Sequence, residues 1–346
     1  MRIAQVAPLY ESVPPGLYGG TERIVSYLTE ELVRQGHDVT LFASGDSRTR
    51  ARLIPMRARA SRLDASCRDP LSAHLVMLER VFARQQAFDL IHYHVDYLHF
   101  PLSRRGTTPH VTTLHGRLDL PDLQAVYDEF PEMPVVSISR AQQAPLPQAN
   151  WLGVVHHGLP RDLHAFSPRG RGYFAFLGRV SPEKRLDRAI EIATRIGKPL
   201  KVAAKVDPHD RDYFEEQIKW RLASPLVEFM GEIDDRAKTH LLGGADALLF
   251  PIDWPEPFGL VIIEAMACGT PVIAFRRGSV PEIVENGVTG FVVDDVEDAV
   301  DAAALVGAID RRQCREVFEQ RFSAERMATD YLELYLRAQL RAGAAA

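Results

Sequence analysis

Hydrophobic and polar positions along the chain follow a pattern that occurs once in each half. In the first half, an apolar run at residues 2–7 predicts a strand, and a glycine-containing loop follows it. Amphipathic spacing over about residues 21–35, ended by Gly36, predicts a helix, and residues 38–43 predict the next strand. The succession of strand, helix and strand is the unit from which parallel sheets are built.

The second half repeats this succession. Residues 173–177 predict a strand, residues 184–196 a helix ended by Gly197, and residues 200–204 another strand. Two such units in one chain predict an α/β fold with two doubly wound parallel sheets. Other short apolar runs predict further strands at residues 90–94, 110–114, 135–138, 227–230, 247–251, 272–275 and 291–293.

Glycine and proline cluster over residues 158–171, which predicts a linker between two domains. We therefore expect a first domain at residues 1–160 and a second at residues 170–323. A last amphipathic stretch, about residues 324–341, predicts a C-terminal helix.

Composition narrows the class of protein. A length of 346 residues suits two domains, and 46% hydrophobic with 25% charged residues is typical of a globular chain. A net charge of -5 argues against a nucleic-acid partner. The three cysteines do not suggest a disulfide framework, and we expect neither a signal peptide nor a membrane-spanning helix, so the predicted location is the cytoplasm.

The most informative stretch begins at residue 256 and runs Glu-Pro-Phe-Gly-Leu-Val-Ile-Ile-Glu-Ala-Met-Ala-Cys-Gly-Thr-Pro. Glu264 lies in a predicted helix that is otherwise apolar on every side, so it should be buried and should have a dedicated partner. The helical rise places Glu256 and Glu264 at most roughly 12 Å apart, which suits the two ends of one elongated polar ligand. The amides at the start of this helix favour an anion. The alternative is structural: Glu264 pairs with an Arg in the core, and Glu256 is an ordinary residue of the first turn.

This stretch resembles the donor-site motif of the retaining GT-B glycosyltransferases, family 4. The resemblance covers nearly the whole chain and implies the GT-B fold, in which two Rossmann-like domains face each other across a cleft. It implies acceptor recognition mainly in the first domain and donor binding in the second. It also implies that the C-terminal helix, about residues 324–346, packs back on the first domain.

The resemblance assigns roles to the motif. It implies that Glu264 binds the ribose hydroxyls of a nucleotide-sugar. It implies that Glu256 binds the sugar together with the backbone amides of Phe258, Gly259 and Leu260.

A second motif, at residues 176–187, runs Phe-Leu-Gly-Arg-Val-Ser-Pro-Glu-Lys-Arg-Leu-Asp between a predicted strand and helix. Arg179 supplies a fork of donors and Lys184 a compact charge, a combination suited to a diphosphate. The motif is similar to the F-x-G-R-x4-K motif of the same family, which implies that both side chains bind the donor diphosphate. A solvated helix start is the alternative.

Two features of the first half are weaker signals. Tyr18, Gly19 and Gly20 precede the first predicted helix, where glycine lets backbone approach a ligand closely and Thr21 is the expected N-cap. The stretch resembles the family's Gly-Gly loop, which lies against the donor phosphate or the acceptor; a structural turn is the alternative.

His115 follows the strand at residues 110–114 and should lie at its carboxyl end, where it could donate to a sugar hydroxyl or tune a nearby charge.

The resemblance implies that His115 lies near the sugar and the reacting carbon, and a structural histidine is the alternative. His92 and His94 are interpreted as structural. A run of arginines over residues 48–62 is interpreted as a solvated loop, although it would also suit a phosphorylated acceptor or an anionic membrane surface.

No convincing pair of aspartates for a metal is found, because Asp207, Asp210, Asp294 and Asp295 are expected in loops unrelated to these motifs. We therefore predict no metal and no cofactor, and we expect Arg179, Lys184 and helix-start amides to stabilise the leaving diphosphate.

The predicted function is that of a retaining hexosyltransferase, which moves a sugar from a nucleoside diphosphate sugar to a hydroxyl of a carbohydrate, lipid or small-molecule acceptor. The predicted location is the cytoplasm, and a peripheral location at the inner face of the membrane is the alternative. Two alternatives stay open: a phosphorylase or nucleotide-sugar epimerase on the same fold, and a non-catalytic protein that binds a nucleotide-sugar.

Overall fold

The computed structural model describes residues 1–16 and 19–345, so Tyr18 of the glycine loop lies outside the described residues. The chain forms two compact units. The first comprises Met1–Pro160 together with Ala324–Ala346, and the second comprises Arg161–Ser323. Each unit is built around its own parallel sheet, and each is described separately below.

The first unit holds a seven-stranded sheet in the order β3-β2-β1-β4-β5-β6-β7, with parallel pairing throughout. Its strands are β1 (Arg2–Val6), β2 (Asp38–Ser44), β3 (Arg52–Arg57), β4 (Leu90–Tyr93), β5 (His110–Thr113), β6 (Val135–Ser137) and β7 (Trp151–Val154). The described helices of this unit are α1 (Gly20–Arg34), α2 (Pro70–Phe82), α3 (Phe100–Ser103), α4 (Asp122–Glu129), α5 (Arg140–Gln143) and α13 (Ala324–Ala345).

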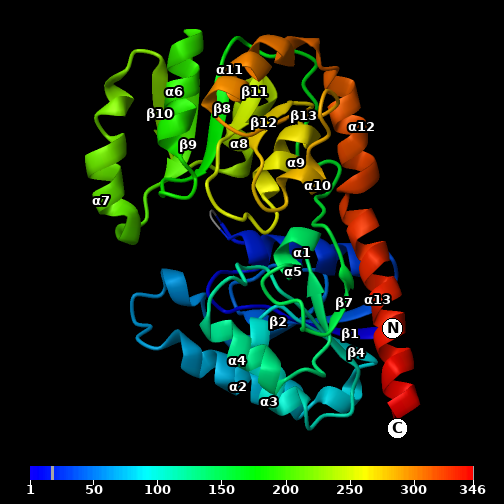
Figure 1. Cartoon of the computed structure of the whole chain (residues 1–346). Helices are drawn as coiled ribbons and strands as arrows, with labels where there is room; N and C mark the ends of the chain where they lie inside the picture. Colours follow the sequence, from blue (N-terminus) through cyan, green and yellow to red (C-terminus); the bar gives the residue numbers. More distant parts are fainter. Residues whose placement is uncertain (17–18, 346) are drawn as a thin grey trace. The chain divides into compact units, whose positions relative to one another are not determined.

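The C-terminal helix α13 belongs to this first unit although the second unit precedes it in the chain. It contacts α1, β5 and β7 (Figure 1). Tyr331 and Tyr335 of α13 are fully buried. Side chains from the two ends of the sequence therefore share one core.

The second unit holds a six-stranded sheet in the order β10-β9-β8-β11-β12-β13, again parallel. Its strands are β8 (Phe174–Arg179), β9 (Leu200–Lys205), β10 (Val227–Gly231), β11 (Ala247–Phe250), β12 (Val272–Phe275) and β13 (Gly290–Val293). Its described helices are α6 (Leu186–Ile196), α7 (Arg211–Tyr213), α8 (Asp235–Gly244), α9 (Leu260–Ala267), α10 (Val280–Ile283), α11 (Val296–Leu305) and α12 (Arg311–Arg321).

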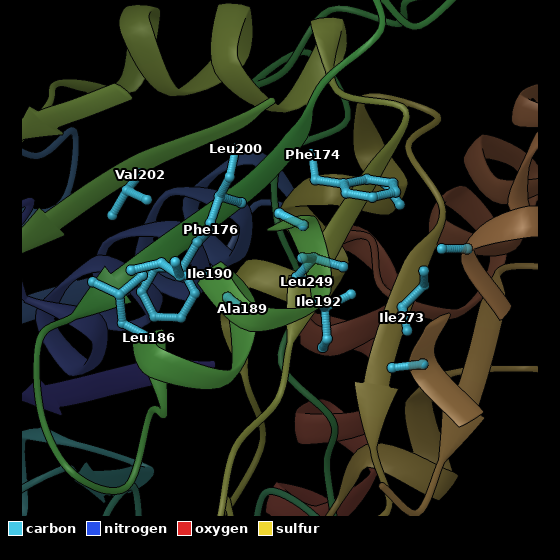
Figure 2. Packing of buried hydrophobic residues seen from close by; sticks show 14 of the residues in the cluster. Phe174, Phe176, Leu186, Ala189, Ile190, Ile192, Leu200, Val202, Leu249 and Ile273 are labelled. Atoms are coloured by element: carbon cyan, nitrogen blue, oxygen red, sulfur yellow. The ribbon is translucent and has the colours of Figure 1, made fainter. Parts of the chain in front are cut away.

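Figure 2 shows how α6 packs on the sheet of the second unit. One face of the helix is apolar at helical spacing, and that face is buried against apolar strand residues, which removes both surfaces from water. The residues in contact include Leu186, Ala189, Ile190 and Ile192 of the helix, and Phe174, Phe176, Leu200, Val202, Leu249 and Ile273 of the strands.

The strand orders confirm the predicted α/β fold with two doubly wound sheets. In each sheet the chain reverses its direction of growth once, between β1 and β4 in the first unit and between β8 and β11 in the second. Ligands of open α/β sheets bind outside the carboxyl ends of the strands at such a switch point. Both switch points are therefore where functional side chains are expected.

The structure corrects three local predictions. Residues 52–57 of the arginine run form the edge strand β3 instead of continuing a solvated loop, and β7 was missed altogether. An edge strand tolerates Arg and Pro55 because one side has no neighbouring strand. Thr21 is not the N-cap of α1, because the helix begins at Gly20 and Gly19 takes the cap position without a side-chain hydrogen bond.

Among the described residues, none of the helices combines the length and the hydropathy needed to cross a lipid bilayer.

Candidate active site

Lys184 and Glu256 meet at the switch point of the second unit. Lys184 lies in the loop between β8 and α6, Glu256 lies in the loop after β11, and the lysine Nζ donates to Oε2 of the glutamate. Trp254 Nε1 donates to the same oxygen at 2.9 Å. The lysine ammonium also lies 5.2 Å from the Trp254 ring centroid and 5.6 Å from that of Phe250. Glu256 is only 8% exposed, so this ion pair is largely shielded from solvent.

The backbone that carries Glu256 is held by the turn after β12. Ser279 donates its amide to the Glu256 carbonyl at 3.0 Å and its hydroxyl to the Phe258 carbonyl at 2.9 Å. Gly278 adopts a left-handed conformation, and a Cβ there would lie 2.3 Å from the Glu256 carbonyl oxygen. Only glycine fits at this position. The contact fixes the course of the loop that leads into α9.

Glu264 lies in the middle of α9 and is 4% exposed. It pairs with Lys238 of α8, whose Nζ lies 2.6 Å from Glu264 Oε1. The predicted burial and the predicted dedicated partner are both present. The structural alternative named an arginine for this role, and the partner is a lysine.

Arg179 ends β8 beside three carboxylates. Its guanidinium nitrogens lie 3.6 Å from Glu183, 3.8 Å from Asp207 and 3.7 Å from Asp210. Burial raises the pKa of Asp210, with its two acidic neighbours adding to the shift while Arg179 opposes it. The prediction that Asp207 and Asp210 lie apart from the motifs is therefore wrong. The loop after β9 brings them to Arg179 because β9 is the neighbour of β8.

Gly19 and Gly20 lie at the start of α1, after β1, as the sequence predicted. A Cβ at Gly19 would lie 2.9 Å from the Pro15 side chain, so the position is crowded by its own loop. This packing explains the glycine at 19 without a ligand.

His115 lies just beyond the carboxyl end of β5, in the first unit. Its Nε2 is 2.9 Å from His94 Nδ1, and its ring stacks on His157 with centroids 5.3 Å apart. Burial lowers the pKa of His115 to about 3, so the imidazole is neutral at physiological pH. It cannot tune a nearby charge as a cation.

His92 and His94 are fully enclosed and hydrogen-bonded, as a structural role requires. His94, however, contacts His115 directly, so its role includes fixing that ring.

Several residues of these sites escaped the sequence analysis. Trp254 stands two positions before the motif and could have been noticed, because a tryptophan indole needs a hydrogen-bond acceptor when it is buried. Lys238 and Gly278 reach the site only through folding. No local pattern marks them.

No group of three or more His, Cys, Asp or Glu side chains within residues 1–16 and 19–345 is arranged to hold a metal ion.

Comparisons with known families cover nearly the whole chain. The family described as "Glycosyltransferase Family 4" matches residues 18–169, and the family described as "Glycosyl transferases group 1" matches residues 165–320. The chain belongs to the group 1 glycosyltransferases, family 4. The predicted resemblance is thereby confirmed, and the protein is a glycosyltransferase.

Individual relatives agree with the family. Glycogen synthase of Mycobacterium tuberculosis is 25% identical, with 98% of this chain and 95% of that protein aligned. The crystal structure of AviGT4, a glycosyltransferase involved in avilamycin A biosynthesis, is 25% identical and superposes with a TM-score of 0.74, covering 98% of each chain. Anabaena HepE, solved with UDP and glucose, is 21% identical with a TM-score of 0.73 over 96% of this chain and 98% of that one, and shares the GT-B fold.

Proposed function

We propose that this glycosyltransferase moves a hexose from a nucleoside diphosphate sugar to an acceptor hydroxyl with retention of anomeric configuration. The observation that carries the proposal is the Lys184–Glu256 pair at the switch point of the second sheet. A cation and a carboxylate in contact suit the junction of such a donor, where the diphosphate ends and the sugar hydroxyls begin.

The diphosphate is assigned to Lys184 and Arg179. The three carboxylates around Arg179 lie at 3.6–3.8 Å, which is longer than the 2.7–2.9 Å or so of a charge-assisted hydrogen bond. The guanidinium therefore keeps donors that can bind phosphate oxygens. These cations neutralise the leaving group, and we propose no metal cofactor; full turnover in the presence of EDTA is the expected result.

The ribose is assigned to Glu264. A carboxylate accepts hydrogen bonds from two vicinal hydroxyls, and it does so most strongly when it is ionised. Lys238, 2.6 Å away, stabilises the ionised form of a carboxylate on a helix that is otherwise apolar. The ion pair thus serves the binding role, because it holds the carboxylate in position and in its ionised form.

The sugar is assigned to Glu256 and to the amides of Phe258, Gly259 and Leu260. These amides precede or begin α9, where backbone N–H groups lack helical partners. The turn at Gly278 and Ser279 holds this backbone in place before the ligand arrives.

In the proposed reaction, the bond between the anomeric carbon and the phosphate oxygen breaks. The acceptor oxygen bonds to the same face of that carbon, and the departing phosphate oxygen takes the acceptor's proton. Arg179 and Lys184 stabilise the charge that develops on the diphosphate. No pair of carboxylates acting as in glycosidases is required. The acceptor and His115 are assigned to the first unit.

UDP-sugars are the first donors to test, since HepE was solved with UDP and glucose. A thermal-shift screen over UDP-, GDP- and ADP-sugars should show one donor that raises the melting temperature. Proton NMR of the product should then show the anomeric configuration of the donor. An inverted product would contradict retention, and turnover that requires free phosphate with a disaccharide would identify a phosphorylase. Tight donor binding with neither transfer nor donor hydrolysis would identify a binding protein.

A further inference from the structure

A buried hydrogen-bond network lies at the carboxyl ends of β1, β4 and β5 in the first unit. It has two arms that meet at Gln5. One arm runs through His94 to His115, and the other runs through residues of α13. The members are Gln5, His92, His94, Thr113, His115, Tyr331 and Tyr335.

Gln5 determines the direction of the arm that leads to His115, and it also donates to the second arm. Its amide nitrogen donates to the Tyr335 hydroxyl at 3.2 Å, and its carbonyl oxygen lies 2.8 Å from His94 Nε2. An amide oxygen can only accept, so His94 must carry its proton on Nε2.

His94 passes this direction on to His115. Burial lowers the pKa of His94 well below its usual range, so the ring is neutral and its Nδ1 is an acceptor. His115 Nε2, 2.9 Å away, must then be the donor. His115 is also neutral, so its one ring proton is on Nε2 and its Nδ1 holds a lone pair.

The second arm agrees with this assignment. The Tyr335 hydroxyl accepts from Gln5 and is therefore able to donate to His92 Nδ1, 2.7 Å away. His92 Nε2 then donates to Thr113 Oγ1 at 2.7 Å, and Thr113 donates to the Tyr331 hydroxyl at 2.9 Å. This direction is compatible with the Gln5 orientation but is not required by it, because the Tyr335 hydroxyl has two lone pairs and either hydroxyl can be the donor between Thr113 and Tyr331.

His115 Nδ1 is the end of the first arm. It is enclosed, and it has no hydrogen-bond partner among residues 1–16 and 19–345. An enclosed acceptor without a donor costs about 1–3 kcal/mol, so such an atom calls for a functional explanation. His115 as a whole residue is half-buried, and a Cβ added at the adjacent Gly116 would have nothing within 4 Å, so a small ring rotation on ligand binding can bring Nδ1 into contact.

We infer that Gln5 and His94 are positioning residues that hold His115 as an acceptor at Nδ1, so that the group it binds is a sugar hydroxyl and not an anionic oxygen. The identity of the ligand rests on the proposed function, whereas the tautomer does not. His115 thus selects a hydroxyl, which replaces the expectation that it donates to one.

The tautomer can be measured without a ligand. Long-range proton–nitrogen NMR of the 15N-labelled protein, with the His115 ring assigned by comparison with His115→Asn, should show a protonated Nε2 and an unprotonated Nδ1. Gln5→Leu removes the acceptor for His94, so His115 should become a mixture of tautomers. Tyr331→Phe is the matched control, because it removes a buried hydroxyl from the other arm and should leave the His115 spectrum unchanged. A protonated Nδ1 in the wild type overturns the inference even if Gln5→Leu fails to fold.

The source of the hydroxyl is found by comparing His115→Leu with His115→Asn, whose amide oxygen can stand near the position of Nδ1. If the hydroxyl belongs to the donor, His115→Leu should weaken calorimetric binding of the nucleotide-sugar by about tenfold and leave binding of the nucleoside diphosphate unchanged. If it belongs to the acceptor, the KM for the acceptor should rise by about tenfold instead. In either case, the change in donor affinity or in acceptor KM should be smaller for His115→Asn than for His115→Leu.

Unchanged donor affinity and acceptor KM in His115→Leu would overturn the assignment of the ligand. A wild-type protein that binds no nucleotide-sugar would overturn the proposed function but leave the measured tautomer standing.

Discussion

Individual side chains of the candidate site in the second unit are paired before any substrate arrives. Lys184 contacts Glu256, and Lys238 contacts Glu264. Such pairs set the charge state and the position of each group, and they make the groups interdependent. The consequence is that single substitutions report on two residues at once.

Lys184→Met and Glu256→Gln should each lower kcat by at least about tenfold. This loss corresponds to about 1.4 kcal/mol of transition-state stabilisation. The fold-decrease in kcat of the double variant should be smaller than the product of the two single fold-decreases, because each single change already breaks the contact. Steady-state rates of nucleoside diphosphate release measure this. The control is the exposed Lys219–Glu215 pair, whose double variant Lys219→Met, Glu215→Gln should match the wild type. Strictly multiplicative losses would show that the pair does not act together.

Glu264→Gln should weaken binding of the nucleoside diphosphate by roughly 10- to 100-fold, because the hydrogen bonds of the ribose hydroxyls to a charged acceptor are lost. The amide keeps an oxygen for Lys238, so the fold should survive better than in Glu264→Ala, which leaves a buried lysine unpaired. Calorimetry measures the affinity. Glu285→Gln, at an ion pair with Arg321 elsewhere in the same unit, should bind normally. Wild-type affinity in folded Glu264→Gln would remove the ribose assignment.

At the scale of elements, the site is made by turns that follow parallel strands. The loop after β8 carries Lys184, and the loop after β11 carries Glu256. The turn after β12 is hydrogen-bonded to the backbone of the Glu256 loop. Loop residues contact a ligand, while the strands fix where each loop begins. Substitutions that touch only backbone should therefore affect activity.

Gly278→Ala should displace the Glu256 loop, because the new Cβ would lie 2.3 Å from the Glu256 carbonyl oxygen. We expect a loss of stability of about 2 kcal/mol or more and a fall in kcat/KM for the donor of at least about tenfold. Thermal unfolding and donor kinetics measure the two effects. Gly287→Ala is the matched control: Gly287 also has a positive φ, 75°, but nothing lies within 4 Å of a Cβ there. Gly287→Ala should lower the free energy of unfolding by about 1 kcal/mol and leave the activity unchanged. Equal loss of activity in both variants would argue against a specific role of the Gly278 turn.

At the scale of the whole molecule, the two units differ in how they should respond to acid. Histidines whose pKa burial lowers cluster in the first unit and include His92, His94, His99, His110, His115 and His157. Burial lowers the pKa of His110 to about 4, whereas an unfolded histidine titrates near about 6.5. Between these values the unfolded chain binds more protons, so the free energy of unfolding must fall as the pH falls.

We therefore expect the first unit to lose stability between about pH 6.5 and pH 5, with each such histidine contributing up to about 1.4 kcal/mol per pH unit. Pulse proteolysis at several pH values, with cleavage sites mapped by mass spectrometry, distinguishes the units. Cleavage should appear first within residues 1–160, and His110→Gln should make the pH dependence shallower. Earlier cleavage within Arg161–Ser323 would contradict this assignment.

Much of the fold follows from short-range sequence pattern. The strand–helix–strand starts at residues 2–43 and 173–204 lie where the pattern placed them, because apolar periodicity reports which face of an element is buried. The edge strands β3 and β7 were missed, because a strand with one neighbour needs no continuous apolar run. The sequence also predicted that Glu264 is a buried carboxylate with a partner, because a charge inside an apolar helix is costly wherever that helix packs.

The sequence by itself determined the class of fold, the family and the stretches that carry the chemistry. These depend on residues that are neighbours in the chain. Only the tertiary structure decided that Lys238 is the partner of Glu264, that Asp207 and Asp210 lie beside Arg179, and that Gln5 joins Tyr335 across 330 positions. The physical reason is that a hydrogen bond or ion pair depends on distance in space, and distance in space is set by the packing of whole elements, which local periodicity does not encode.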